Sequence, residues 1–273
     1  MKKIGQQNTE MPDPSADVSI YPITQATTAT FSELYFRLTF LFFIQSGSKY
    51  VSTPAQSEMV GQEGDLMIFP PGSFVTMENR PVMNGDYKAL GVCFAHNLVN
   101  SVFSDLPRLS VTDGIQIVRA ADYQPNEILK LIEETLGNAS LPEPIRQHRL
   151  LEPLVWLRQH GFQLPTHNQE DPLSQIRRLI ETDLSHAWMA DEVASHLAMS
   201  EATMRRRLAA QGQAFSKILL HARLERGLTL LQTTDAQISQ VALECGFKTP
   251  SHFSDAFRNR FGIQPKEIRS TLK

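Results

Sequence analysis

A unit of two short helices joined by a tight turn is predicted twice in the last third of the chain, and this repetition constrains the fold more than any other feature. The first copy is "MADEVASHLAMS" followed by "EATMRRRLAAQG", and the second is "DAQISQVALECGFKTPSHFSDAFRNRFG". Each copy has a Val-Ala pair in its first helix and a Ser or Thr placed as the N-cap of its second helix. The repetition predicts a helical domain built from two helix-turn-helix units.

The second helix of the first unit, predicted over 201–211, presents two arginines on its outward face. Met204 and Leu208 lie four residues apart, which defines the buried face of the helix. At 3.6 residues per turn, four residues point away from that face: Ala202, Arg205, Arg206 and Ala209. Small residues let a helix approach a surface closely, and arginine can donate two hydrogen bonds to guanine O6 and N7. The pattern favours a DNA-reading helix, with a solvated charged face as the alternative.

The second helix of the second unit presents hydroxyl and acidic groups together with an arginine. Thr249 is placed as its N-cap and Pro250 at its first position, where the missing N–H costs nothing. An apolar stripe defines its buried face: Phe253, Ala256, Phe257 and Phe261. The residues predicted to face DNA are Ser251, Asp255 and Arg258, with Ser254 on the flank and Lys248 before the helix for a phosphate contact. Hydroxyl and carboxylate groups also read base edges.

Residues 214–231, between the two units, predict one long amphipathic helix. At 1.5 Å per residue this helix is about 26 Å long. Successive major-groove segments on one face of DNA lie about 34 Å apart. A spacer of this order predicts that one chain places its two reading helices in successive groove segments.

The charge distribution agrees with a polyanionic partner for this part of the chain. The whole sequence has a net charge of −3, whereas residues 171–273 contain 14 Lys and Arg against 11 Asp and Glu. The excess of acidic residues therefore lies in the first 170 residues.

The first part of the chain predicts a different architecture, so that the protein as a whole falls in the α+β class. Between Phe31 and Phe94, β-branched and aromatic residues are separated by turn sequences such as "QSGS", "QEGD" and "PPGS", a pattern typical of a meander or a small barrel. Two amphipathic helices follow. The expected organisation is an N-terminal domain over 1–162 (barrel about 18–120, helices about 126–161), a linker over 163–172 and a C-terminal domain over 173–273.

Residues 174–271 resemble the DNA-binding domain of the AraC/XylS family of bacterial transcription regulators. The most specific stretch is "VALECGFKTPSHFSDAFRNRFGIQPKEIR", which has the family's Gly-Phe, Ser-His-Phe, Phe-Arg and Phe-Gly and a Pro before the last helix. The stretch "VASHLAMSEATMRRRLAAQGQAF" also fits the first unit. By position, the resemblance implies base contacts at Ala202, Arg205, Arg206, Pro250, Ser251, Ser254 and Asp255.

Two of these positions depart from the family pattern. Ala202 offers only an apolar contact, such as one with a thymine methyl group. Asp255 stands where many members have a basic or neutral side chain. We therefore expect the first unit to carry most of the specificity, with Arg206 in the groove and Arg205 at a base or a phosphate. For Arg207, on the far flank, we expect a phosphate contact or a partner within the chain.

The stretch "EGDLMIFPPGSFVTM" resembles the strand and turn of the cupin-like sensor domains in the same family. Metal-binding cupins use clustered His with a Glu, whereas residues 60–95 contain no His and His96 stands alone. We expect no metal, no other cofactor and no enzyme activity. The barrel is expected either to bind a small effector or to act as a protein-docking and dimerisation scaffold, as in members that control virulence or type III secretion genes. The candidates for a dimer seam, with packing against the barrel as the alternative, are Leu150, Leu154 and Leu157.

Together these features predict a cytoplasmic, sequence-specific DNA-binding transcription regulator. The resemblance implies an activator with promoter DNA and RNA polymerase as partners, acting as a homodimer, and a regulatory protein or small molecule as the signal. No membrane partner is expected, because the N-terminus lacks the apolar stretch of a signal. The run "LTFLFFI" is too short to span a bilayer and predicts a buried strand instead. The alternative is a sensor that acts mainly through protein contacts, with DNA binding secondary.

Overall fold

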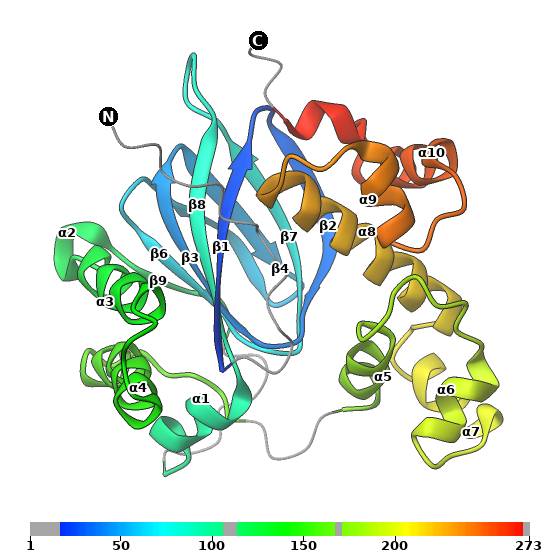
Figure 1. Cartoon of the computed structure of the whole chain (residues 1–273), viewed down its shortest axis with the longest axis horizontal. Coiled ribbons are helices and arrows are strands. Elements are labelled where there is room, and N and C mark those ends of the chain that lie inside the picture. The colour runs from blue at the N-terminus through cyan, green and yellow to red at the C-terminus, as the bar shows by residue number, and fades with distance from the viewer. Residues whose placement is uncertain (1–16, 106–113, 167–170, 270–273) are drawn as a thin grey trace.

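Two packed β-sheets with helices on one side are followed along the chain by a domain made of helices (Figure 1). The computed structural model describes residues 17–105, 114–166 and 171–269. The predicted α+β architecture, with strands first and paired helix-turn-helix units last, is confirmed. No helix in these described ranges is long and apolar enough to cross a membrane.

The two sheets are antiparallel throughout and together use nine strands of the described chain. The first sheet has the order β1 (Val18–Gln25), β8 (Tyr87–Phe94), β3 (Thr39–Ser46), β6 (Leu66–Phe69) and β9 (Gln116–Val118). The second has the order β2 (Ala29–Phe36), β7 (Ser73–Arg80), β4 (Ser48–Thr53) and β5 (Gln56–Gly61). Because strands consecutive in sequence switch between the sheets, the inner faces of the two sheets share one core.

Strand β3 explains the apolar run "LTFLFFI" in the sequence. Phe42 and Ile44 point into the space between the sheets, where they join its apolar core. Leu41 and Phe43 point to the other side, where helices cover the sheet. A strand that is buried on both faces reads as a continuous apolar run rather than an alternating one.

Helices cover the outer face of the first sheet (Figure 1, green). They are α1 (His96–Phe103), α2 (Ala120–Tyr123), α3 (Asn126–Gly137) and α4 (Glu143–Gln159). Helix α4 packs on α1 and α3. The apolar positions predicted at helical spacing therefore face the sheet and the neighbouring helices.

The three leucines predicted as a dimer seam lie in this internal core. Leu150 is 3% exposed, and Leu154 and Leu157 are each 0% exposed. Their side chains are already covered within the chain, so the prediction that they form a dimer seam is wrong. The alternative weighed from the sequence, packing against the barrel, describes them correctly.

The helical domain contains α5 (Pro172–Ile180), α6 (Ala190–His196), α7 (Glu201–Ala209), α8 (Phe215–Thr233), α9 (Ile238–Glu244) and α10 (Pro250–Phe261), and then a short 3-10 helix over Pro265–Ile268. The long helix α8 runs between the first unit, α6 and α7, and the second unit, α9 and α10 (Figure 1). Asp171 is the N-cap of helix α5, and its carboxylate accepts from the backbone N–H groups of Leu173 and Ser174.

The helical domain packs directly against the sandwich. Helix α8 lies along β1, and α10 lies against β2 (Figure 1). The rings of Phe31 in β2 and Phe261 in α10 meet edge to face at 5.4 Å. At the predicted linker, Leu164 is 2% exposed and belongs to the N-terminal core, and 167–170 lie outside the described residues. The sequence predicted two domains and gave no sign of this contact between them.

Candidate nucleic-acid interface

Helix α7 has the exposure pattern that its sequence predicts. The Ser200 hydroxyl accepts from the Thr203 backbone N–H at 3.2 Å and caps the helix. Met204 and Leu208 are each 1% exposed, in the core of the first unit. Four residues predicted to point outward are exposed: Ala202, Arg205, Arg206 and Ala209. The helix therefore presents exposed arginines between small side chains, as its sequence predicts.

The three consecutive arginines of α7 differ in their partners. Arg205 donates from Nε to the Glu201 carboxylate, one turn earlier, at 2.6 Å. Arg206 and Arg207 are exposed and have no hydrogen-bond or ion-pair partner within the described ranges. The intramolecular partner considered for Arg207 is therefore not found there, and a phosphate contact stays a prediction.

Helix α10 also has the N-cap and the buried face that its sequence predicts. The Thr249 hydroxyl accepts from the His252 backbone N–H at 3.2 Å. Phe253 and Phe257 are each 0% exposed. The Phe257 ring contacts the Phe253 ring in a tilted arrangement and the Phe261 ring edge to face, along the buried side. Of the residues predicted to face DNA, Ser254 is half-buried and the others are exposed: Lys248, Pro250, Ser251, Asp255 and Arg258. Both units therefore present a short, capped helix to solvent.

The turns of the two units share one hydrogen-bond pattern. In each turn, one N–H donates three residues back and the next N–H donates five residues back, at 2.9 to 3.0 Å. The residue that donates three residues back has left-handed backbone angles, with φ of 53° at Ala198 and 76° at Gly246. This pattern satisfies the last carbonyl groups of a helix and reverses the chain. The sequence repeat is thus a repeat of backbone geometry, with alanine in one copy where the other has glycine.

Glu225, near the middle of α8, connects α5 to α10. Its Oε1 accepts from Arg260 of α10 at 2.6 Å, and its Oε2 accepts from Arg177 of α5. The two arginine side chains are 8% and 4% exposed. The partners lie 35 and 48 residues from Glu225, so no sequence spacing could have identified this buried cluster.

The same cluster reaches the sandwich through β2. Arg260 donates to the backbone carbonyls of His221 at 2.9 Å and of Glu33 at 3.1 Å. The Glu33 carboxylate pairs with Lys217 of α8 at 3.0 Å. Burial, and then the nearby Arg260 charge, lowers the pKa of His221 to about 4. His221 is therefore neutral at physiological pH. The Arg260 guanidinium binds groups within the chain and holds α10 in place, so it is not available to DNA.

A buried polar chain makes a second connection between the sandwich and α8. Lys49 is 0% exposed and donates to Asn79 Oδ1 at 2.6 Å. Asn79 and Gln232 of α8 each donate to Gln25 Oε1 at 2.9 Å. The Lys49 ammonium also lies 4.2 Å from the ring centroid of Phe42. Burial lowers the pKa of Lys49 to about 7. Sequence reasoning missed this lysine, because a single Lys in a strand gives no sign that it points inward.

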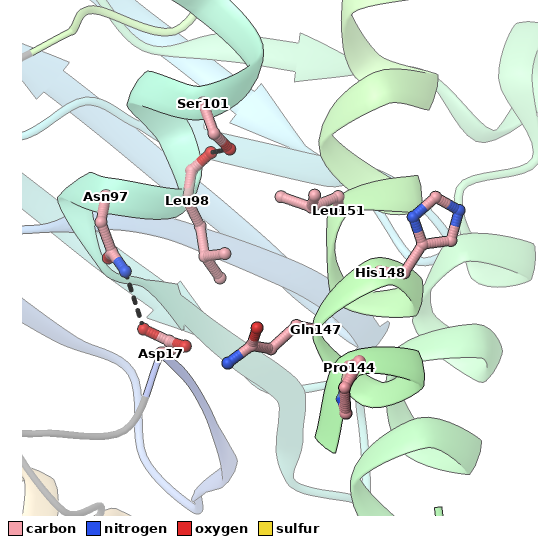
Figure 2. Close-up of a pocket in the computed structure, with 8 residues that line it drawn as sticks. All are labelled: Asp17, Asn97, Leu98, Ser101, Pro144, Gln147, His148 and Leu151. Atoms are coloured by element: carbon pink, nitrogen blue, oxygen red, sulfur yellow. Dashed lines mark hydrogen bonds between the residues drawn. The ribbon is translucent and has the colours of Figure 1, made fainter. Parts of the chain in front are cut away.

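A groove of about 420 Å³ lies between α1 and α4 at the start of β1 (Figure 2). Asp17, Asn97, Ser101, Gln147 and His148 supply its polar lining, together with Leu98, Pro144 and Leu151. Asn97 donates to the Asp17 carboxylate at 2.9 Å across one side. In the described part of the chain, no group of three or more His, Cys, Asp or Glu is placed to hold a metal ion.

The comparisons with known proteins agree with the geometry of the helical domain. A family model described as "Helix-turn-helix domain" matches residues 193–271. The transcriptional regulator SirC of Salmonella typhimurium is 40% identical over 98 residues, which cover 36% of this chain and 33% of SirC. The transcriptional activator AggR of Escherichia coli is 35% identical over 99 residues, covering 36% of this chain and 37% of AggR. The chain therefore matches about a third of the length of these relatives.

Most of the chain shares its fold with a solved structure. The crystal structure of ToxT from Vibrio cholerae O395 superposes with a TM-score of 0.64 and covers 92% of this chain and 96% of ToxT, at 14% sequence identity. This likeness extends the comparison to the sandwich, which the relatives above do not cover. The resemblance found in the sequence is confirmed: the C-terminal helices of this chain are similar to the helix-turn-helix domain of AraC/XylS-family transcription regulators.

Proposed function

We propose that this chain is a sequence-specific DNA-binding transcription regulator that places α7 and α10 in successive major-groove segments. The observation that carries the proposal is the pair of capped, exposed helices at the two ends of α8, one of which presents Arg205 and Arg206 between alanines. Helix α8 has 19 residues and is therefore about 28 Å long. That length suits two helices that enter groove segments about 34 Å apart.

Selection from a randomised duplex library tests this proposal. The full chain is expected to enrich a defined sequence, with a guanine-containing element for the first unit. Affinity for the enriched duplex should fall steeply between about 50 and about 200 mM salt, because phosphate contacts release counterions. A chain that enriches no sequence, or whose affinity does not change with salt, would contradict the proposal. A salt-independent affinity is the result expected if the chain is a sensor that acts chiefly by binding another protein.

Activation is the proposed direction of regulation. AggR, which matches the helical domain, is a transcriptional activator. An activator that binds next to a promoter raises transcription by contacting RNA polymerase. In transcription with purified polymerase, the enriched site placed upstream of a weak promoter should raise the yield, and a lowered yield would contradict activation.

The proposed signal for the N-terminal domain is a small apolar molecule, with a protein partner as the rival. Aromatic rings from four strands gather between the sheets: Tyr21, Phe36, Phe40, Phe42 and Phe69. Three of them, Tyr21, Phe36 and Phe40, are only partly buried. One ToxT structure holds a bound unsaturated fatty acid, so such an acid is the first probe. It should raise the thermal midpoint of the wild-type chain but not of Phe40→Asp, whereas an equal shift in both would contradict a site at these rings.

We further propose that the N-terminal half dimerises through a surface other than the buried leucines. Ile145 and Val155 of α4 are 48% and 53% exposed and remain available. Sedimentation of the full chain should give a dimer that Val155→Glu weakens, while Leu154→Ala should act through stability alone. A monomer at all concentrations would contradict dimerisation.

A further inference from the structure

The ion pair between Glu201 and Arg205 has a geometry that bears on how α7 reads DNA. Glu201 is the first residue of α7, and Arg205 lies one turn later on the outward face. A single carboxylate oxygen, Oε1, accepts from Nε and lies 2.6 Å from Nη2 of the guanidinium. The carboxylate thus occupies the side edge of the guanidinium, formed by Nε and Nη2.

The opposite edge of this guanidinium remains free to bind another group. Arginine has five N–H groups in a fixed plane, and Glu201 uses only those on the side edge. The end edge, formed by Nη1 and the second N–H of Nη2, still offers two parallel donors. Guanine presents O6 and N7 in the geometry that two parallel donors require. Arg205 can therefore keep its contact with Glu201 and bind one guanine at the same time.

Neither of the other two arginines is held in this way. Arg206 and Arg207 make no such contact with the described residues, so their long side chains sample several rotamers in solution. A side chain that is already fixed loses less conformational entropy when it binds, and it tolerates fewer alternative base contacts. The difference separates one fixed arginine from two mobile ones on the same turn.

We propose that Glu201 is a positioning residue that fixes Arg205 for bidentate recognition of one guanine. The proposal rests on the proposed function, since it concerns how the DNA-binding helix α7 selects its site. Glu201 itself contacts no base in this arrangement. Its removal should relax the preference for guanine at one position and leave the preferences at the other positions unchanged.

The test is selection from a randomised duplex library with the full chain, three variants of the ion pair, a matched control variant and one double variant. Arg205→Lys, which has a single ammonium in place of the fork, identifies the position that Arg205 reads, and guanine preference there should fall by roughly 5- to 100-fold. Glu201→Ala should lower the guanine preference at that same position by about two- to fivefold. Glu201→Gln keeps an acceptor oxygen and should retain part of the preference.

Asp191→Ala is the matched control, because it removes one carboxylate from the first turn of α6 in the same unit. It should change affinity for all sequences alike, through net charge only. In the double variant, the losses of guanine preference caused by Glu201→Ala and Arg205→Lys should be non-additive at that one position. If Glu201 acted only through net charge, the two losses would add.

Three results would overturn the proposal. They are an unchanged guanine preference in Glu201→Ala, a uniform change equal to that of Asp191→Ala, or a loss at a position different from the one Arg205→Lys affects. If the wild-type chain enriches no sequence at all, the proposed function fails as well. If it enriches a site that Glu201→Ala binds with the same preferences, only the role of Glu201 fails.

Discussion

Helices α7 and α10 come from the same kind of unit, yet they are held in different ways. Helix α7 directs its arginines to solvent, and Glu201 in the same helix fixes one of them. Helix α10 turns Arg260 inward, where Glu225 and the Glu33 carbonyl hold it. It also packs its Phe261 ring on β2 and leaves an acidic residue, Asp255, on its outer face.

The comparison shows that a repeated local structure does not imply a repeated role. Both units have a capped second helix and the same turn geometry. What differs is the surface on which each unit lies, because only α10 has extensive contacts with the sandwich. We infer that the first unit reads sequence and that the second unit also anchors the helical domain to the sandwich.

Glu225→Gln should give the largest effect and tests the anchor. The nearly buried Arg260 would lose its charged partner, and Arg177 would keep only Glu181, at 3.2 Å. Removing one member of a buried pair costs about 3–5 kcal/mol. The free energy of unfolding, measured by urea denaturation, should fall by an amount in that range. Glu201→Gln removes an exposed pair and should change it by less than about 1 kcal/mol. Equal losses of unfolding free energy in the two variants would contradict the inference that the second unit, and not the first, anchors the helical domain.

Lys49→Met tests the second connection between the sandwich and α8 through its dependence on pH. The pKa of Lys49 is about 7 in the folded chain and 10.5 in the unfolded chain. Between these two pH values the unfolded chain therefore binds more protons than the folded chain. Wild-type stability therefore rises with pH over this window, by on the order of 5 kcal/mol in total. Below pH 7 the Lys49 contribution no longer changes with pH.

Urea denaturation at a series of pH values measures this contribution. The free energy of unfolding of Lys49→Met minus that of wild type should be largest near pH 7 and should decrease steadily toward pH 10. A difference that stays constant over this range would show that Lys49 is charged in the folded chain.

Arg206→Ala tests the reading side of the comparison. It should cost about 1–3 kcal/mol of binding free energy for the enriched duplex and relax preference at one base pair. Arg258→Ala on α10 is the matched variant and should weaken binding less and more uniformly. Competition binding against single-base variants of the duplex measures both, and a larger selective loss in Arg258→Ala would reverse the roles of the units.

Ala198→Gly should give the smallest effect and compares the two turns directly. Ala198 has φ of 53°, a left-handed backbone conformation that is strained for a residue with a Cβ. The second unit has Gly246 at the corresponding position. The substitution should stabilise the chain by about 0.5–1 kcal/mol, since relief of this strain outweighs the extra freedom of glycine when unfolded. Gly246→Ala should destabilise it, because a Cβ would lie 2.2 Å from the Leu184 carbonyl oxygen. A destabilised Ala198→Gly would mean that the first turn carries no strain.

The local features of the helical domain could be predicted because the signals that fix them are close in sequence. The four-residue spacing of Met204 and Leu208 fixed which side of α7 is buried, and Ser200 and Thr249 identified the two N-caps. The apolar run in β3 likewise identified a buried strand.

The sequence alone could not say what each buried surface packs against. The leucines of α4 have the same helical spacing whether they face a second chain or their own sheet, and the structure places them on the sheet. The inward position of Lys49 depends on which face of β4 the second sheet turns to the core.

The sequence by itself determined two helix-turn-helix units, the capped second helix of each unit and the order of strands before helices, since periodicity and capping act over a few residues. Only the tertiary structure decided that Glu225 joins Arg177 to Arg260 and that Gln232 reaches Gln25. These partners lie between 35 and 207 residues apart, and folding brings them together through the burial of apolar faces elsewhere.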